Sequence, residues 1–233
     1  MIFLRDFDIY PYFIVFYMIP KTIYLYHNEL QENITYSDKW VLLNPEYTIR
    51  ICGYDACKTI MRNTLPSIFY QTFMKISSRE VRADFFKLCI LYHYGGIMID
   101  VDLEPLCSLN SFIGTADIVL CKAMEEDTKY KYCTKFIAFY SESNLLKELL
   151  YRFINNSLTG HNIFNAATWD LSKMIEQIIV HENIHRGGIY KLNKLTLHIL
   201  EQQSGTFFYD ACITYNKKRI MNDRQTYFAE KET

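Results

Sequence analysis

The sequence predicts an α/β protein in which short buried strands alternate with amphipathic helices. Apolar runs rich in β-branched and aromatic residues are bounded by proline or glycine, as strands are. Between these runs, apolar residues recur at helical spacing. The chain has 233 residues, of which 50% are hydrophobic and 22% charged, enough for one domain with a substantial core. Because no linker or internal repeat divides the chain, we expect residues 1–233 to form a single domain.

The individual elements follow from local signals. A first strand begins beside Pro20, and the turn signal Asn44-Pro45 precedes a second strand. Apolar spacing then predicts helices, and a capped helix leads into a third strand. The expected elements are strands at 19–26, 47–51, 97–99, 118–121 and 136–140, and helices at 55–62, 66–76, 77–94, 145–155 and 165–181.

The helix before the third strand has clear start and stop signals. Ser77 followed by Glu80 is a capping box, in which the two residues satisfy backbone N–H groups at the helix start. Gly95 and Gly96 end the helix, where a left-handed conformation is favoured. The residues between these signals that recur at helical spacing are Val81, Phe85, Leu88 and Tyr92.

Three acids follow the third strand. Asp100, Asp102 and Glu104 occupy alternate positions after the apolar run 97–99, and Pro105 is expected to stop the strand. In α/β sheets the ligand crevice lies at the carboxyl ends of the strands, where these acids should fall. Alternate strand positions lie about 6.6 Å apart, so a turn or a bridging water must bring two carboxylates to one cation. Oxygen ligands favour Mg²⁺ or Mn²⁺, and such an ion would bridge the diphosphate of a nucleotide sugar.

Acids at alternate positions also occur in unrelated motifs and on ordinary surfaces. A surface pair of aspartates is the simplest alternative. A haloacid-dehalogenase phosphatase would need Thr or Val where Glu104 stands, and a calcium EF-hand would need Gly at Pro105 and Glu at Ser111. Both of these motifs fit poorly, and the clustered acids after an apolar strand favour a ligand role.

The net charge and the cysteines indicate which kinds of partner and which cellular compartment to expect. The net charge of −1 gives no general attraction to nucleic acid, so we expect no nucleic-acid partner. The seven cysteines are an odd number with irregular spacing and no CxxC pair, which predicts buried thiols in a reducing, cytoplasmic compartment. A secretory lumen is disfavoured. The abundance of Tyr, Phe, Ile, Asn and Lys is compatible with an AT-rich genome, including a viral one.

The N-terminal region is apolar but short. Residues 9–19 are strongly apolar, yet this run is far shorter than the ~20 residues that cross a bilayer, and it contains Pro11. Arg5, Asp6 and Asp8 make a poor signal-peptide start. We therefore expect no transmembrane segment, with a peripheral membrane contact left open.

The central segment resembles a known family. Residues 83–106, ADFFKLCILYHYGGIMIDVDLEPL, resemble the DXD-containing sugar-transferase family, which includes fungal α-1,6-mannosyltransferases, animal α-1,4-galactosyltransferases and, more distantly, the clostridial glucosylating toxins. The segment 19–24, IPKTIY, is similar to the family's first strand. The resemblance covers roughly residues 19–170. It implies a GT-A fold, which is Rossmann-like, here with additional helices, and a metal-dependent, retaining transfer of a hexose from a UDP- or GDP-sugar.

The resemblance also assigns roles to residues. Asp100 and Asp102 match the metal- and ribose-binding acids, and Asp84 matches an acid that bonds donor-sugar hydroxyls. Lys87 stands where the family has Arg, which keeps the charge but loses the bidentate fork. The implied catalytic residues are Asp84, Lys87 and Asp102, the implied metal ligands are Asp100 and Asp102, and the implied cofactor-binding residues are Asp84, Gly95, Gly96, Asp100 and Asp102. The family's donor-closing residues near the C-terminus have no clear match, and residues 209–216 are the candidate segment.

The spacing of Asp84 and Lys87 has a meaning independent of the resemblance. Residues three apart on a helix are neighbours, so these side chains should meet, either as a surface ion pair or as a joint contact to the donor.

These observations define one main function and two alternatives. We expect residues 19–125 to bind the nucleotide sugar and metal, and residues 126–233 to face the acceptor, which is a carbohydrate, protein or lipid. The alternatives are a Mg²⁺-dependent phosphoryl-transfer hydrolase and a catalytically weak nucleotide-sugar-binding protein.

Overall fold

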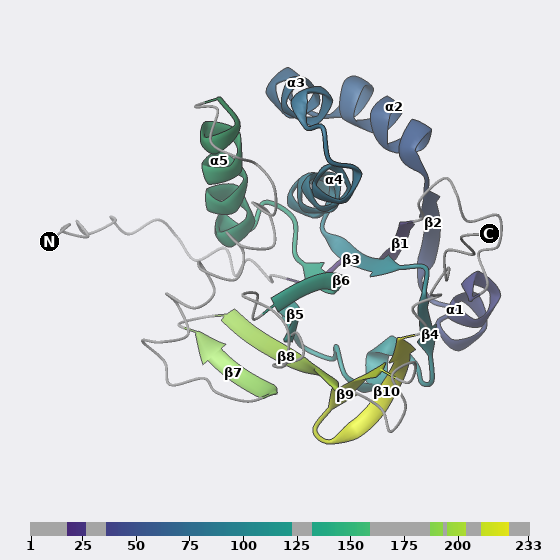
Figure 1. Cartoon of the computed structure of the whole chain (residues 1–233). Helices are drawn as coiled ribbons and strands as arrows, with labels where there is room; N and C mark the ends of the chain where they lie inside the picture. The colour runs from purple at the N-terminus through teal and green to yellow at the C-terminus, as the bar shows by residue number, and fades with distance from the viewer. Residues whose placement is uncertain are drawn as a thin grey trace, which may run out of the picture.

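The computed structural model describes residues 18–26, 36–122, 132–158, 187–192, 195–203 and 211–223. In this part of the chain, ten strands form one mixed sheet (Figure 1). The strands are β1 (Thr22–Tyr26), β2 (Thr48–Cys52), β3 (Gly96–Asp100), β4 (Leu103–Pro105), β5 (Ile118–Lys122), β6 (Tyr132–Phe139), β7 (Gly188–Leu192), β8 (Leu195–Gln203), β9 (Ala211–Tyr215) and β10 (Lys218–Asp223). The α-helices are α1 (Ser37–Leu43), α2 (Tyr54–Thr64), α3 (Ser67–Lys75), α4 (Arg79–Tyr94) and α5 (Asn144–Leu158).

The sheet has a parallel part and a curled antiparallel part. Its strand order is β2-β1-β3-β6-β5-β8-β9-β10-β4, with β7 also paired to β8. Strands β2, β1 and β3 are parallel, so their carboxyl ends meet at one edge. Strand β4 follows β3 after only two residues, yet its partner is β10. The sheet therefore curls, and its last strand lies close in sequence to the end of β3 (Figure 1).

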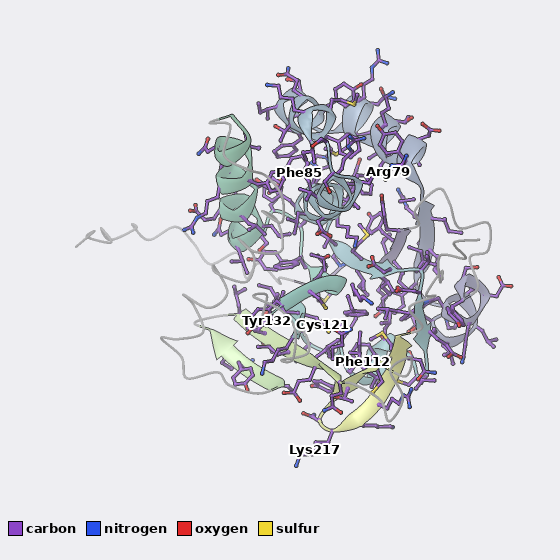
Figure 2. All side chains as sticks on the ribbon, in the orientation of Figure 1. Arg79, Phe85, Phe112, Cys121, Tyr132 and Lys217 are labelled. Atoms are coloured by element: carbon purple, nitrogen blue, oxygen red, sulfur yellow. The ribbon has the colours of Figure 1, made fainter. Side chains whose placement is uncertain are left out.

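Two apolar clusters cover the two faces of the sheet. In β1, Ile23 and Leu25 belong to one cluster and Tyr24 to the other, as strand alternation requires. Helices α2 to α5 close over the cluster that contains Phe85, and the opposite cluster contains Phe112 (Figure 2). Burial on both faces explains why residues 97–99 read as a continuous apolar run.

Most of the predicted elements are confirmed. The predicted strands correspond to β1, β2, β3, β5 and β6, and the predicted helices up to residue 155 correspond to α2, α3, α4 and α5. The helix expected at 165–181 and most of the apolar run 9–19 lie outside the described residues. Helix α1, strand β4 and the strands β7 to β10 were not predicted. No helix in the described ranges is long and apolar enough to cross a bilayer.

Two local predictions were wrong in detail. The N-cap of α4 is Ser78, whose Oγ accepts from the backbone N–H of Val81, because the helix begins one residue later than the Ser77 box required. Pro105 does not end β3. It ends the separate strand β4, at the edge of the sheet, where a missing N–H is tolerated.

Gly95 and Gly96 allow the helix-to-strand turn between α4 and β3. Their φ angles are 65° and 109°, which L-residues with a side chain rarely adopt. A Cβ at Gly95 would lie 2.7 Å from the backbone N of Ser141, and one at Gly96 would lie 2.8 Å from the carbonyl O of Thr22. The two glycines stand at the opposite end of β3 from Asp100. The structure thus gives them a steric role at the helix-to-strand turn, and their expected contact with the donor stays a prediction.

Candidate active site

The site lies where the carboxyl ends of β1 and β3 meet the middle of α4. Asp100 ends β3 and pairs with Tyr26 at the end of β1. Asp84 and Lys87 project from α4, one turn apart, and Asp102 lies in the turn that follows β3. We call Asp84, Asp100 and Asp102 the acidic cluster.

Lys87 joins two members of the acidic cluster. Its Nζ lies 2.6 Å from Asp100 Oδ1 and 3.6 Å from Asp84 Oδ1, and its side chain is only 4% exposed. The Nζ also lies 5.5 Å from the centroid of the Tyr26 ring. Burial would lower the pKa of Lys87, but the Asp100 and Asp84 carboxylates together outweigh it and raise that pKa. Lys87 is therefore a fixed cation within the site, and the predicted contact with Asp84 is confirmed.

The surroundings of Asp100 raise the pKa of its carboxyl group. Burial raises the pKa of Asp100 to about 6, with Asp102 and Asp84 adding to the rise and Lys87 opposing it. The ionised form of Asp100 is therefore less favourable in the folded protein than in water, in spite of its lysine partner. Such a carboxylate gains from any further cation that comes close to it.

A bulge in β6 brings two more polar side chains to the cluster. Val119 pairs with Ala138 and Cys121 pairs with Cys133, so a single residue of β5 stands opposite four residues of β6. Bulges disturb strand alternation and redirect side chains, often beside active sites. In this bulge, Thr134 Oγ1 donates to Asp84 Oδ1 at 2.6 Å, and Lys135 Nζ lies 3.6 Å from Asp102 Oδ2.

Tyr26 closes the site on the β1 side. Burial raises the pKa of Tyr26 to about 12, so its phenol is neutral at physiological pH. The ring lies against Lys87 and Phe86, which holds it in place. A neutral tyrosine at this position offers an apolar face and a hydroxyl, the combination that suits sugar rings.

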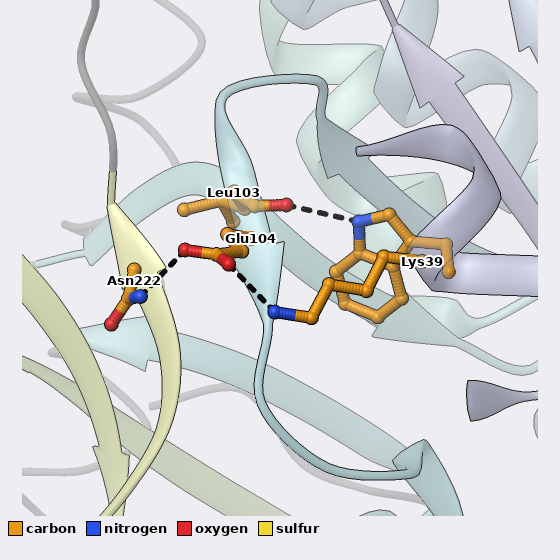
Figure 3. Close-up of polar contacts among 5 residues, drawn as sticks. Lys39, Leu103, Glu104 and Asn222 are labelled. Carbon is orange, nitrogen blue, oxygen red and sulfur yellow. Dashed lines mark hydrogen bonds and ion pairs between the residues drawn. The ribbon is translucent and has the colours of Figure 1, made fainter. Parts of the chain in front are cut away.

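The segment after Asp102 is fixed from two sides (Figure 3). Glu104 accepts from Lys39 Nζ of α1 at 2.6 Å and from Asn222 Nδ2 of β10 at 2.6 Å. The indole Nε1 of Trp40 donates to the carbonyl of the neighbouring Leu103 at 2.9 Å. The third acid of the motif thus serves to hold the chain, and it anchors the turn that carries Asp102.

The chemistry of the donor set fits a hard divalent cation that takes part of its shell from substrate. Asp100 and Asp102 supply carboxylate oxygens, the ligand type of Mg²⁺ and Mn²⁺. Within the described ranges, no three His, Cys, Asp or Glu side chains are arranged to hold a metal. A magnesium site commonly uses one or two carboxylates, with substrate phosphates and water completing the shell. Two acids at this strand end agree with that pattern.

The structure thus gathers the predicted Asp84, Lys87, Asp100 and Asp102, and adds Tyr26, Thr134 and Lys135. Thr134 and Lys135 were missed because the strand at 136–140 was expected to start after them, and Tyr26 was missed because its pairing with Asp100 follows from strand register. Two polar residues in an otherwise apolar strand were the available signal. In the candidate segment 209–216, the described part is strand β9 and the turn after it, and residues 209–210 lie outside the described ranges.

Comparisons with known proteins agree with this geometry. Residues 31–119 match the family described as "Glycosyltransferase sugar-binding region containing DXD motif". Two proteins of Saccharomyces cerevisiae are similar. "Putative glycosyltransferase HOC1" is 26% identical over 136 residues, covering 51% of this chain and 34% of that protein. "Mannosyl phosphorylinositol ceramide synthase CSH1" is 31% identical over 105 residues, covering 41% of this chain and 28% of that protein. The matched part is thus about a third of each relative.

A solved structure shows the fold. The chain resembles "PaToxG Glycosyltransferase" with a TM-score of 0.54 at 16% identity, covering 70% of each chain. The expected α/β fold of the Rossmann-like GT-A type is therefore confirmed. None of these comparisons points to a phosphoryl-transfer hydrolase. Residues 31–119, which contain Asp84, Lys87, Asp100 and Asp102, are similar to the DXD-containing glycosyltransferase sugar-binding family, as the sequence resemblance indicated.

Proposed function

We propose that this chain is a metal-dependent, retaining hexosyltransferase that moves a sugar from a UDP- or GDP-sugar to a carbohydrate, protein or lipid acceptor. The observation that carries this proposal is the acidic cluster at the end of β3, with Lys87 bound into it, inside the region that matches the sugar-binding family. The name of the yeast synthase includes a mannosyl group and a ceramide lipid. Mannose is therefore the first donor sugar to test, and a lipid the first acceptor.

Asp100 and Asp102 are the proposed ligands of Mn²⁺ or Mg²⁺. When bound, the ion would neutralise the donor diphosphate and the leaving nucleotide. The raised pKa of Asp100 supports this role, because a crowded carboxylate gains from an added cation. Glu104 supports the site indirectly, since its bonds to Lys39 and Asn222 hold the turn on which Asp102 stands.

Asp84 is proposed to bind the donor sugar. Its carboxylate is oriented by the Thr134 hydroxyl at 2.6 Å and by Lys87 at 3.6 Å, so little reorganisation is needed when a sugar hydroxyl donates to it. Lys87 keeps Asp84 and Asp100 at fixed positions, and its ammonium charge favours the negative charge that develops on the nucleotide.

We also propose that two parts of the chain have different roles. Residues 19–125 would bind the donor and metal, and residues 126–233 would face the acceptor. Residues of the second part also contact the donor side. Thr134 contacts Asp84, Lys135 contacts Asp102, and Asn222 contacts Glu104. All seven cysteines carry thiols in the structure, which supports a reducing, cytoplasmic location.

Donor turnover by matched variants tests the proposal. Wild-type protein should bind and slowly hydrolyse one nucleotide sugar of a UDP and GDP panel when Mn²⁺ is present, and should lose both in excess EDTA. Asp100→Asn and Asp102→Asn should lower turnover at least about 100-fold. The melting temperature of Asp102→Asn should be unchanged or slightly higher, because repulsion between acids is relieved. That of Asp100→Asn should fall, because the buried Lys87 loses its 2.6 Å partner, so turnover is compared per folded molecule. Glu148→Gln, an exposed substitution on α5, is the control and should behave as wild type.

Four other outcomes would contradict the proposal. Near-normal turnover by either aspartate variant, or full activity in EDTA, would remove the metal role. Donor binding without any transfer or hydrolysis would favour a nucleotide-sugar-binding protein. Hydrolysis of simple phosphate esters without sugar transfer would favour a phosphoryl-transfer hydrolase.

A further inference from the structure

Two cysteines face each other across the sheet beside the acidic cluster. Cys121 of β5 and Cys133 of β6 are directly opposed in an antiparallel pair. Figure 2 labels Cys121 next to Tyr132, which precedes Cys133 on β6. Cys121 is fully buried, whereas Cys133 is partly exposed, so Cys133 is the more accessible member of the pair.

The backbone geometry of this pair suits a disulfide. Directly opposed residues of antiparallel strands have Cα atoms about 4.5–5.5 Å apart, depending on the type of pair. Disulfides need a Cα separation of about 4.4–6.8 Å. Since both types of opposed pair fall within this range, the two sulfurs can be joined without separating β5 from β6.

The surroundings activate the exposed thiol. A hydrogen bond from the Cys121 thiol lowers the pKa of Cys133, and the backbone N–H and the charge of Lys135 lower it further, against the opposing effects of burial and of the Asp100 charge. A cysteine with a more populated thiolate is the better nucleophile toward a disulfide or peroxide. Cys133 is therefore the attacking residue, and the buried Cys121 is placed behind it to resolve the product.

We propose that Cys121 and Cys133 form an oxidation site whose co-reactant is a small disulfide such as oxidised glutathione. The Cys133 thiolate attacks one sulfur of glutathione disulfide, forming a mixed disulfide and releasing one glutathione thiolate. The Cys121 thiol then loses its proton and attacks the Cys133 sulfur, which forms the Cys121–Cys133 bond and releases the second glutathione. The two cysteines are oxidised by two electrons, and glutathione disulfide is reduced to two glutathiones.

The disulfide would act on the site through Lys135, a step that rests on the proposed function. Lys135 lies two residues after Cys133 and acts electrostatically on both Cys133 and Asp102. Oxidation removes the negative charge that Cys133 can carry, so the ammonium group interacts more strongly with Asp102 and competes there with the metal-bound donor. We expect donor affinity in the presence of Mn²⁺ to fall about twofold to fivefold, in keeping with the strength of a partly exposed ion pair.

Mass spectrometry tests the site without reference to activity. The whole chain is incubated with oxidised glutathione, free thiols are alkylated, and the protein is digested. The expected result is a peptide linked between Cys121 and Cys133 that disappears on reduction. In Cys121→Ser the expected product is a stable glutathione adduct on Cys133. Cys107→Ser removes another partly exposed thiol, and the Cys121–Cys133 link should still form there.

The outcomes separate the two proposals. The oxidation site would be overturned if folded wild-type protein gave no linked peptide, or if glutathione adducts were spread evenly over the cysteines. Either result would count whether or not the protein binds a donor. A linked peptide with unchanged donor affinity would overturn the effect on Asp102. Failure of the reduced protein to bind any donor would overturn the proposed function alone. Circular dichroism of each serine variant shows whether the variant is folded. If a variant is not folded, the presence or absence of the linked peptide in wild-type protein decides the proposal.

Discussion

Lys87 Nζ and Asp100 Oδ1 lie 2.6 Å apart, and this contact joins the middle of α4 to the last residue of β3. Removing only one partner of a buried pair leaves the other charge uncompensated. Lys87→Met should therefore lower the free energy of unfolding by about 2–4 kcal/mol and should also abolish donor binding. Urea denaturation and donor titration measure the two effects.

The control for Lys87→Met is Lys147→Met, which removes an exposed lysine from α5. It should change stability by no more than about 0.5 kcal/mol. Lys87→Met with wild-type stability and wild-type donor binding would show that Lys87 has no part in the site.

Asn222 in β10 is expected to matter for the acidic turn although it lies far away in sequence. Asn222→Leu keeps most of the volume but removes the Nδ2 bond to Glu104 at 2.6 Å. A hydrogen bond to a charged group contributes about 1.5–3 kcal/mol, so unfolding by denaturant should begin at correspondingly lower concentration. Lys218→Ala, at an exposed position of the same strand, should leave the transition unchanged. Equal midpoints for the two variants would argue against the anchor.

Gly96 should not tolerate alanine. A Cβ there would lie 2.8 Å from the Thr22 carbonyl in a backbone with φ of 109°, so we expect Gly96→Ala to cost about 2–4 kcal/mol through strain and displacement. Gly114 also has positive φ, at 48°, but no atom lies within 4 Å of the position that a Cβ would take there. Gly114→Ala should cost only about 1–2 kcal/mol. Thermal unfolding of both variants separates the effect of the steric contact, present only at Gly96, from the effect of positive φ, present at both glycines. A smaller destabilisation at Gly96 than at Gly114 would contradict the packing described.

His198 should make stability depend on pH. Its Nδ1–H donates to the carbonyl of Phe112 at 2.8 Å, and burial lowers its pKa in spite of that bond. Below about pH 6.5 the unfolded chain therefore binds a proton that the folded chain resists, so stability falls as pH decreases through this window. His198→Gln should have a flatter pH profile of unfolding between about pH 5 and pH 7 than wild type has.

The control for this pH dependence is His93→Gln, which changes an exposed histidine on α4. Its profile should keep the wild-type slope. A His198→Gln profile parallel to that of wild type would mean that other groups cause the acid sensitivity.

The sequence was most informative where the interacting residues are close together along the chain. The spacing of Asp84 and Lys87 on one helix predicted their contact, and the apolar run before Asp100 predicted the strand that places it. Short-range periodicity is the part of folding that a single sequence displays directly.

The remainder depends on strand pairing, which periodicity does not determine. Lys135 approaches Asp102 only because β6 bulges opposite β5, and an irregular register has no signature in local alternation. Glu104 has the residue type of a metal ligand, but Lys39 and Asn222 occupy it from a helix and a strand that the sequence did not position. Its actual role follows from the curled sheet.

Pairing of β4 with β10 also has a consequence for biosynthesis. Glu104 and Asn222 are 118 residues apart, and a ribosome adds roughly 5–20 residues per second. The acidic turn is therefore translated roughly 6–24 s before its last anchor. During that interval the nascent chain has the helix and strand that carry Asp84 and Asp100, but β4 still lacks its neighbour. An unpaired strand edge favours association with chaperones, and we expect them to associate with the nascent chain between the synthesis of β4 and that of β10.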